Sequence, residues 1–414
     1  LGMPGTGKSS TIAVLVRILV ELGQRVLLCS HTHSAVDTIV SKLLDAPVLR
    51  LGPLSRVHPR VHACTLTARL GTCATSEEVV QVVAEAQIVA ATCLGTSDAV
   101  LARRAFDVCI IDEASQITVP TCLGPLRLAD RFVMIGDHHQ LTPLVRDTDA
   151  AQHGMSVSLF QRLCKAHPSS VAMLCTQYRM NADIMALSNA LVYDGRLVCG
   201  NESVARAKLA MRRDACPSWL RDALDPARPA VFVDTDAIQA VESRADTLVE
   251  NRGEAEWIVR MSDVLIQANV AVADIGILTP YRQQAKLLRD RCACEVLTVD
   301  QAQGRDWPVV LVSLVRSNKT HTVGELLRDQ RRVNVMITRA KTKLVLVGSY
   351  STMIHGPCTE PMPALLPLLR MIQPKEPADI PMHESPERQR YVKKARRPTP
   401  VVTDLLNEQD CIAE

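Results

Sequence analysis

The sequence predicts an α/β protein in which helices cover both faces of doubly wound parallel sheets. Three observations lead to this fold class. Short apolar runs alternate with amphipathic stretches, several of these runs end in polar residues, and a glycine-rich phosphate loop opens the chain. Because parallel strands bring their carboxyl ends to one edge of a sheet, we expect these polar residues to gather around a ligand at that edge.

The glycine-rich loop fits the pattern G-x-x-x-x-G-K-[ST] of the P-loop, which binds the phosphates of a nucleotide. Its glycines let backbone N–H groups point at phosphate oxygens, Lys8 adds a positive charge, and Ser9 offers a hydroxyl to Mg²⁺. A chance glycine turn is the alternative, but the helix-like residues 10–22 and the strand-like residues 25–30 argue against it. The candidate nucleotide contacts are Gly2, Pro4, Gly5, Thr6, Gly7, Lys8, Ser9 and Ser10.

The position of this loop is unusual. A P-loop is expected to follow a buried strand, yet only Leu1 precedes this one, and the chain begins without Met. We therefore expect the chain to be a piece of a longer protein or an incomplete gene product. Its first domain would then be truncated at the N-terminus.

The composition suits a soluble globular protein of two or three domains, with 414 residues of which 47% are apolar and 22% charged. A net charge of only +3 implies that any nucleic-acid site is a local groove. The 14 cysteines include no C-x-x-C pair, and those inside apolar runs, such as Cys29 and Cys109, predict buried reduced thiols in a reducing compartment. No apolar run reaches the roughly 18 residues of a membrane span.

Strands in the first part of the chain are predicted at residues 25–30, 87–92, 106–111 and 131–135. The third of these strands ends in two carboxylates, Asp112 and Glu113. Asp112 would reach Mg²⁺, directly or through water, and Glu113 would polarise the attacking water as a general base. A solvated acidic loop is the alternative, but it explains poorly why two carboxylates follow an apolar strand.

Two further strand ends carry polar residues. Gln140, shortly after the fourth strand, suits the sensing of a γ-phosphate, although an ordinary surface turn explains this segment equally well. Residues 31–34 read His-Thr-His-Ser and could hold a sugar-phosphate backbone. Taken alone, they are better explained as the start of a helix over residues 35–44 that Ser34 caps.

A second α/β pattern follows a predicted linker at residues 167–170. Its strands are expected at residues 171–175, 230–234, 274–278, 295–299, 309–315 and 343–348, and a helix at residues 333–337. This part has no P-loop, but Arg179 and Arg339 follow ordered elements, and an arginine from a second domain can stabilise the charge on a transferring phosphate. For either residue taken singly, a surface salt bridge is the better explanation.

The C-terminal residues differ in composition. Residues 361–414 contain nine prolines and a single apolar stretch, residues 364–372, which predicts a flexible tail. Within it, residues 393–397 read Lys-Lys-Ala-Arg-Arg. This basic run could be a nuclear address, an electrostatic anchor for nucleic acid, or a solubilising segment.

Taken together and in order, these segments resemble the superfamily 1 helicases over about residues 1–355. Besides the P-loop, the matching motifs are residues 112–115 (D-E-A-S), 136–141 (G-D-x-x-Q-L), 177–180 (Q-Y-R-M), 299–304 (V-D-x-x-Q-G) and 334–341 (N-V-x-I-T-R-A-K). The Q-Y-R-M form is similar to the branch that contains the nonsense-mediated-decay RNA helicase. Within that branch, residues 31–37, 315–318 and 322–327 look like the eukaryotic replication helicase/nucleases that process Okazaki-fragment flaps.

The resemblance implies two RecA-like domains, residues 1–168 and 169–358, and a flexible Pro-rich basic tail, residues 359–414. ATP and Mg²⁺ would bind between the two domains. The ATP-site residues implied are Lys8 and Ser9 for phosphate and Mg²⁺, Asp112 for Mg²⁺, Glu113 for activation of water, Gln140 for sensing the γ-phosphate, Arg179 and Arg339 as arginine fingers, Tyr178 beside the nucleotide, and Asp306 on the ribose side.

A single nucleic-acid strand would run across both of these domains. The residues that the resemblance implies in contact with it are Thr32, His33, Thr92, Pro280, Tyr281 and Thr298. Contacts with the backbone rather than with bases suit a motor that must step along any sequence. The aromatic content of only 3% agrees with few stacking platforms.

The chain also departs from the family pattern. It lacks the glutamine-bearing segment that contacts adenine in these helicases, which leaves adenine specificity open. It also lacks the nuclease domain and the cysteines of its cluster, so an iron–sulfur cluster would belong to an upstream nuclease region. Trp307 stands where relatives often carry a polar residue.

Three functions remain to be compared. The first is an ATP-driven translocase and helicase on single-stranded DNA, with five-prime to three-prime polarity taken from the family. It would act on flap or fork structures in the nucleus or the mitochondrion, with a single-strand-binding protein as a partner and no membrane. The second is an RNA helicase of the same branch, which would differ in its contacts with the 2′-OH. The third is a non-catalytic nucleic-acid clamp; a simple P-loop kinase is disfavoured because it would not need the second half of the chain.

Overall fold

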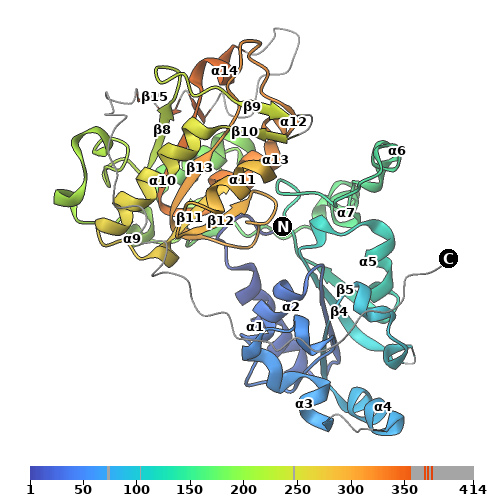
Figure 1. Ribbon diagram of the computed structural model, residues 1–414. Helices are drawn as coiled ribbons and strands as arrows, with labels where there is room; N and C mark the ends of the chain where they lie inside the picture. Colours follow the sequence, from blue (N-terminus) through green and yellow to red (C-terminus); the bar gives the residue numbers. More distant parts are fainter. Residues whose placement is uncertain are drawn as a thin grey trace, which may run out of the picture. The chain divides into compact units, whose positions relative to one another are not determined.

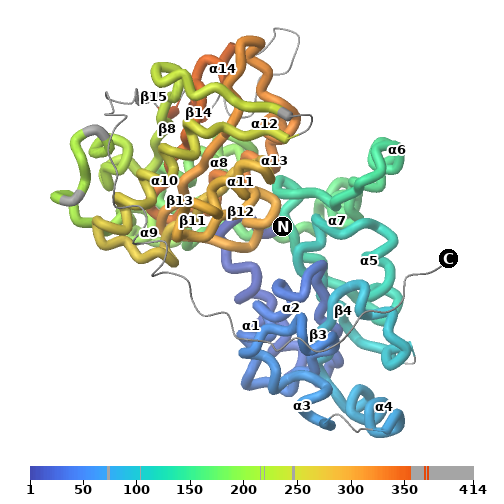
Figure 2. Tube along the Cα trace, in the orientation of Figure 1, coloured from blue at the N-terminus to red at the C-terminus, as the bar shows by residue number. Residues whose placement is uncertain are grey.

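The computed structural model describes residues 1–71, 75–102, 104–245, 248–355, 368–369, 371–372 and 374–375 (Figure 1; Figure 2). Two larger sheets organise these residues, one formed within residues 26–134 and the other within residues 230–375. The strand pairs of both sheets are parallel. The predicted α/β class with doubly wound parallel sheets is therefore confirmed.

The first sheet has the strand order β2-β3-β1-β4-β5. Its strands are β1 (Val26–Ser30), β2 (Val48–Arg50), β3 (Ile88–Thr92), β4 (Phe106–Asp112) and β5 (Ala129–Met134). β1 and β3 are buried along their whole length, as expected for parallel strands covered on both faces. Ser30 is level with both Thr92 and Asp112 in the strand register, so three polar strand ends meet at one edge.

Helices cover both faces of this sheet. The helices are α1 (Lys8–Glu21), α2 (His33–Val40), α3 (Leu66–Leu70), α4 (Ser76–Glu85), α5 (Val119–Leu126), α6 (Thr148–Ala150) and α7 (Leu159–Ala166). Successive side chains of β1 enter two different clusters, because side chains alternate along a strand. Val26 and Leu28 pack with residues of α1 and α2, whereas Leu27 and Cys29 pack with residues of α5 and α7.

The second sheet has the strand order β12-β11-β13-β14-β8-β15. Its strands are β8 (Ala230–Asp234), β11 (Ile275–Thr279), β12 (Glu295–Thr298), β13 (Trp307–Ser313), β14 (Ala340–Gly348) and β15 (Pro374–Lys375). Two small sheets pair β6 (Thr176–Gln177) with β7 (Val198–Cys199), and β9 (Ser243–Ala245) with β10 (Leu248–Glu250). β11 and β12 end level with each other, at Thr279 and Thr298.

The helices of this second part complete its core. They are α8 (Ala182–Ser188), α9 (Glu202–Ala205), α10 (Arg252–Gln267), α11 (Arg282–Arg289), α12 (Glu325–Arg328), α13 (Gln330–Ile337) and α14 (Tyr350–Ile354). Residues of α8 and α13 share one hydrophobic cluster with Val310 and Val312 of β13. α10 packs against β13 and β14 as well, so helices enclose the central strands of the sheet.

Two predicted strands need correction. Residues 171–175 form no strand; Leu174 makes one isolated bridge to Gly2, and its N–H donates to the carbonyl of Leu1 at 2.9 Å. These two partner residues are too few for a ladder. The strand predicted over residues 309–315 ends at Ser313, because Val315 adopts a left-handed backbone with φ 73°.

Part of the predicted flexible tail packs on the second sheet, which is a further correction. Leu368, Leu369 and Ile372 are buried in the same cluster as β13, and β15 pairs with β8. These apolar side chains explain the order, because they cover part of that hydrophobic cluster. The basic run at residues 393–397 lies outside the described residues, and the domain limits at residues 168 and 358 stay predictions.

Cysteine burial agrees with the prediction. Cys29 and Cys109 are fully buried, and every cysteine in the described ranges is a free thiol. Burial raises the pKa of the Cys29 thiol well above its ordinary value. Within the described ranges, no helix has both the length and the apolar character needed to cross a membrane.

Candidate nucleotide and nucleic-acid site

The P-loop has the backbone conformation that its glycines predict. Gly7 is left-handed, with φ 79°, and forms the N-cap of α1 without any side-chain cap. Because no side chain caps α1, N–H groups at the start of this 14-residue helix remain available to an anion. Lys8 folds back so that its Nζ donates to the carbonyl of Gly2 at 2.9 Å, and a Cβ at Gly2 would collide with the Lys8 stem.

The two carboxylates after β4 lie in different environments. Asp112 is 4% exposed, and its Oδ1 has no hydrogen-bond partner in the described part of the chain. Burial raises the pKa of Asp112 to about 7, and the neighbouring Glu113 adds to this, while Lys8 opposes it. A buried carboxylate oxygen without a partner fits a divalent cation, and oxygen is the ligand atom that Mg²⁺ prefers.

Glu113 begins a turn with a left-handed backbone, φ 52°, which is uncommon for a residue with a side chain. Its Oε2 accepts hydrogen bonds from Gln116 Nε2 at 3.0 Å and from Gln303 Nε2 at 3.3 Å. The other side-chain atom of Gln303, Oε1, is buried and unpartnered among the described residues. Gln303 is therefore a candidate site residue that our assignment from the sequence missed, although it lies in one of the recognised motifs.

Gln140 lies in a buried hydrogen-bond network. Its Nε2 donates to Asp137 Oδ2 at 2.9 Å, and the same oxygen accepts from the Tyr193 hydroxyl at 2.6 Å. Asn334 of α13 donates from Nδ2 to the Tyr193 oxygen at 2.8 Å. Gln140 is thus 4% exposed and tied to α13 through Tyr193, which the surface-turn alternative does not explain. No sequence signal marked Tyr193, whereas Asp137 and Asn334 lie in recognised motifs.

Arg179 follows β6 and is held next to the P-loop. The N–H of Tyr178 donates to the carbonyl of Gly5 at 2.9 Å, which links the two segments. Arg179 Nη2 pairs with Asp306 at 2.9 Å, and Lys341 Nζ pairs with the same carboxylate at 2.7 Å. These cations hold the pKa of Asp306 below its ordinary value despite its burial. Asp306 is therefore a shared anchor for two cations.

Arg339 is a buried cation without a carboxylate partner. It is 2% exposed, and in the described part of the chain it forms no ion pair. Its Nε donates to the carbonyl of Val335 at 2.9 Å and its Nη2 to Thr338 Oγ1 at 2.9 Å. Burial and the neighbouring Arg179 lower the pKa of Arg339 to about 9, although Glu113 and Asp306 oppose this shift. The surface salt bridge considered from the sequence is thus wrong for Arg339, whose environment suits an arriving anion.

Tyr178 presents an exposed ring. The side chain is 59% exposed, and the ring lies against Gly200, where a Cβ would collide with it. Tyr178 is adjacent in sequence to Arg179 and is bonded to the P-loop through its backbone. An exposed aromatic ring at this position can stack on a planar ligand.

The strand ends of the first sheet place three predicted nucleic-acid contacts. Thr32, not Ser34, is the N-cap of α2, accepting from the N–H of Ala35 at 3.2 Å. The predicted Ser34 cap is wrong because α2 begins at His33, two residues earlier than expected. Thr92 ends β3, and its Oγ1 accepts from the N–H of Gly95 at 3.1 Å.

His33 is oriented by a buried ion pair. Arg50 is fully buried and pairs with Asp37, with 2.8 Å between Nε and Oδ1. Its Nη2 lies 3.0 Å from His33 Nδ1. Because a guanidinium only donates, Nδ1 must accept and Nε2 must carry the ring proton. Burial lowers the pKa of His33, and Arg50 lowers it further, so the imidazole is held neutral as a donor.

The strand ends of the second sheet place the other three predicted contacts. Pro280 and Tyr281 directly follow β11, and Thr298 ends β12 beside it. Thr298 Oγ1 accepts from the N–H of Gln301 at 3.4 Å. Tyr281 is mostly buried, which raises the pKa of its hydroxyl, while nearby Arg316 opposes this rise. Each sheet therefore brings its predicted strand contacts to one edge.

A phosphate loop, a carboxylate pair and cations from a second sheet define a P-loop nucleotide-binding protein. Two protein-family models, each described as an AAA domain, match the chain: one at residues 1–78 and 72–147, the other at residues 155–351. Both halves of the chain therefore match models of AAA domains.

Sequence relatives narrow this class. The chain is 45% identical over 391 residues to the DNA replication ATP-dependent helicase/nuclease DNA2 of Homo sapiens, which covers 88% of this chain and 36% of the relative. It is 44% identical over 365 residues to the helicase/nuclease JHS1 of Arabidopsis thaliana, an alignment that covers 86% of this chain and 27% of the relative. It is 42% identical over 374 residues to DNA2 of Saccharomyces cerevisiae, with 85% of this chain and 24% of the relative covered. The predicted resemblance to these helicase/nucleases is confirmed. The chain spans about a third or less of the length of these relatives.

A search of solved structures found the Arterivirus nonstructural protein 10 helicase in complex with DNA. It shares 16% identity with this chain at a TM-score of 0.44, and the alignment covers 83% of this chain and 58% of the viral chain.

Proposed function

We propose that this chain is the ATP-driven motor of a DNA helicase that translocates along single-stranded DNA. The observation that carries the proposal is the contact between Glu113 and Gln303. It joins the carboxylate that follows the first sheet's β4 to a motif that follows the second sheet's β12. A hydrolytic base that touches the strand-binding half can couple turnover to movement of that half.

The ATP side of the mechanism is assigned to the P-loop and to the carboxylates that follow β4. The P-loop and the uncapped start of α1 would hold the phosphates, with Lys8 adding charge. Ser9 and Asp112 would hold Mg²⁺, which screens phosphate charge when it is bound. Glu113 would take a proton from the attacking water, and Gln303 keeps its Oε2 oriented.

Cations from the second half would stabilise charge on the transferring phosphate. Arg339 is buried and forms no ion pair among the described residues, and Arg179 is beside the P-loop, so both suit the role of arginine fingers. Gln140 would report the γ-phosphate to α13 through Asp137 and Tyr193. The nucleotide would lie by Tyr178, with Asp306 on the ribose side as well as anchoring Arg179.

Strand movement would arise from alternating grip at the two sheet edges. Thr32, His33 and Thr92 supply hydroxyl and imidazole donors at the first edge. Pro280, Tyr281 and Thr298 would contact the strand at the second edge. Closure around ATP and reopening after hydrolysis would move one edge relative to the other.

The identity of the nucleic acid is taken from the relatives, whose names describe DNA replication helicase/nucleases. These names support DNA over RNA. Flap or fork structures as substrates, a single-strand-binding protein as partner and a nuclear location complete the proposal and follow from the family resemblance of the sequence motifs. The proposed architecture is two RecA-like domains divided near residue 168, with ATP and Mg²⁺ as ligands. Any iron–sulfur cluster would belong to a nuclease region outside this chain.

Unwinding of tailed duplexes tests the proposal. The chain is mixed with ATP, Mg²⁺ and a fluorescent duplex that carries a single-stranded tail at either the five-prime or the three-prime end. We expect strand separation with the five-prime tail at a rate at least about tenfold above that with the three-prime tail. Binding of both duplexes without ATP-dependent separation would contradict the helicase proposal and favour the clamp, and separation of RNA duplexes alone would favour the RNA helicase.

A further inference from the structure

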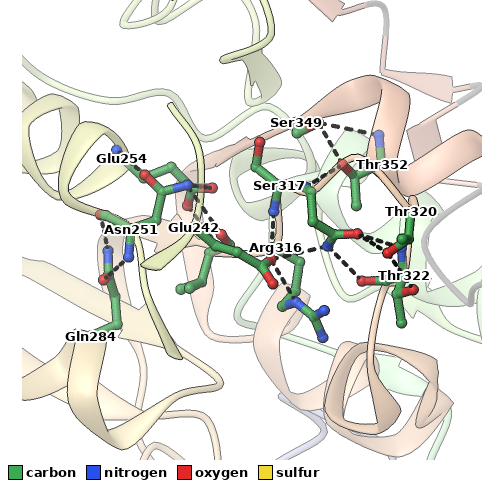
Figure 3. Close-up of polar contacts among 12 residues, drawn as sticks. Glu242, Asn251, Glu254, Gln284, Arg316, Ser317, Thr320, Thr322, Ser349 and Thr352 are labelled. Carbon is green, nitrogen blue, oxygen red and sulfur yellow. Dashed lines mark hydrogen bonds and ion pairs between the residues drawn. The ribbon is translucent and has the colours of Figure 1, made fainter. Parts of the chain in front are cut away.

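A buried polar network lies at the carboxyl edge of the second sheet, beyond the residues predicted from the sequence (Figure 3). It connects β13, the loop over residues 314–324, the start of α10 and the segment before β9. Figure 3 shows Glu242 and Arg316 between a group formed by Asn251, Glu254 and Gln284 on one side and Thr320 and Thr322 on the other.

The network begins with a strained residue. Val315 has φ 73°, a left-handed conformation that is strained for a residue with a β-branched side chain. Its N–H donates to Glu254 Oε2 at 2.7 Å, and its carbonyl accepts from Asn251 Nδ2 at 3.1 Å. The backbone of Val315 is therefore clamped on both of its polar groups.

The clamp is itself fully hydrogen-bonded. Ser313 Oγ donates to Glu254 Oε2 at 2.7 Å, and Gln284 Nε2 donates to Ser313 Oγ at 3.0 Å and to the carbonyl of Asn251 at 2.9 Å. All four of these side chains are fully buried. A buried polar cluster at this depth is held in one arrangement, because leaving any member unpaired would be costly. The chain is thus forced to turn at Val315.

This turn brings Arg316 onto Glu242. Arg316 Nε lies 2.8 Å from Glu242 Oε2, and the two side chains are 7% and 8% exposed. The same oxygen accepts from the N–H of Ser317 at 2.9 Å and from Asn318 Nδ2 at 3.1 Å. Glu242 therefore fixes the guanidinium and the following backbone together.

The far side of the Arg316 guanidinium meets Tyr281. A Cβ on Gly324 would collide with Arg316 Nη1 and lie 3.1 Å from the Tyr281 hydroxyl, so the guanidinium and the hydroxyl lie beside the same point. Arg316 accordingly opposes the rise that burial causes in the pKa of this hydroxyl. Gly324, with φ 83°, closes the loop over this pair. Among the three residues of this edge that are predicted to contact a nucleic-acid strand, Tyr281 alone has an aromatic ring. Its hydroxyl lies beside Arg316, which Glu242 holds in place.

We propose that Arg316, fixed by Glu242, is a positioning residue that orients Tyr281 for contact with single-stranded DNA; this inference rests on the proposed function. Arg316 is 6% exposed and engaged through Nε, so it acts through Tyr281 rather than as a phosphate contact itself. The strain at Val315 is explained by this role, because strained backbone persists where surrounding contacts hold it for a purpose.

A double-mutant cycle on strand affinity tests the proposal. Wild type, R316K, Y281F and the double variant are titrated against a fluorescent oligothymidylate, followed by anisotropy without nucleotide. We expect R316K and Y281F each to weaken binding about five- to tenfold, because each breaks the same contact. The double variant should then bind no more than about twofold more weakly than the weaker single variant.

Two further measurements separate positioning from a purely structural role. In the DNA-stimulated ATPase assay, R316K should raise the half-saturating DNA concentration about five- to tenfold, while the maximal rate changes less than about twofold. E242Q, which keeps the shape of the side chain and removes its charge, should weaken binding in the same direction. R206K is the matched control, since the Arg206 side chain is 79% exposed at the C-cap of α9 and pairs with Glu202 at the start of that helix.

The outcomes are distinguishable. Multiplicative losses in the double variant, or affinities of R316K and E242Q equal to that of wild type, would overturn the positioning role alone. A fall of the maximal rate in parallel with the thermal midpoint would show that Arg316 only supports the fold. Absence of binding by the wild-type chain would contradict the proposed function, and this inference with it.

Discussion

The nucleotide side of the molecule and the polar network of the second sheet differ in whether their buried polar groups have hydrogen-bond partners. On the nucleotide side, Asp112 Oδ1 and Gln303 Oε1 are buried without a hydrogen-bond partner in the described part of the chain, and the Arg339 guanidinium donates there only to uncharged oxygens. In the network, Glu254 and Glu242 each accept several hydrogen bonds. A buried group left without a partner is held for a ligand, whereas a saturated group holds the backbone in place.

The largest effect is expected for a substitution of Glu113 on the nucleotide side. E113Q removes the proposed base but keeps a side chain that can bond Gln303 and Gln116. We expect kcat for ATP to fall about 10³-fold, as for loss of a general base, while nucleotide affinity changes less than about threefold. Steady-state hydrolysis and binding of a fluorescent ATP analogue measure the two effects. E85Q, an exposed change at the end of α4, is the control; a loss under about tenfold in E113Q would remove Glu113 from the mechanism.

R339K tests the buried cation. Lysine keeps the charge but loses the fork that bonds Val335 and Thr338 and that would face a phosphate. We expect kcat to fall about 10²-fold with a modest change in the thermal midpoint. A matched change at R206K should leave both values unchanged. If R339K hydrolyses ATP at the wild-type rate, Arg339 is a structural cation and is not held for the phosphate of ATP.

The pH dependence of stability tests the saturated side. Burial raises the pKa of Glu254 from an ordinary 4.5 to about 8, so the folded state retains a proton that the unfolded state releases between these values. The stability contributed by this proton should fall as the pH rises from about 5 to about 8, by a few kcal/mol at most, and then level off. E254Q should flatten this part of the profile, as followed by urea unfolding. Identical profiles of stability against pH for the wild type and E254Q would show that Glu254 does not cause this pH dependence.

The smallest expected effect concerns His33. Because Arg50 fixes His33 as a neutral donor, glutamine can supply a similar N–H. H33Q should therefore bind the oligothymidylate within about threefold of wild type, with the same pH profile between about pH 6 and pH 8. Binding by wild type that tightens towards pH 6, and that H33Q abolishes, would show instead that His33 is charged on DNA.

The parts of this account that are local in sequence could be predicted. The P-loop, the strand that ends in Asp112 and the strand ends at Thr92 and Thr298 depend on short patterns of glycine, apolar and polar residues. The family motifs added Arg339, whose burial a pattern alone does not reveal.

The parts that depend on distant residues could not be predicted. Val315 lies in an apolar run and has a β-branched side chain, so local preference favours a strand. Only Glu254 and Asn251, more than sixty positions earlier, override that preference. The same holds for the contact of Glu113 with Gln303, which are separated by 190 positions.

The most direct test of the central claim is ATP hydrolysis by this chain with and without single-stranded DNA, compared with RNA of equal length and sequence. If the Glu113–Gln303 contact couples the two halves, DNA should raise kcat at least about tenfold, and RNA less. Equal hydrolysis in all three conditions, despite measurable binding of DNA, would contradict the account, because the second half would then hold a strand without driving the nucleotide site.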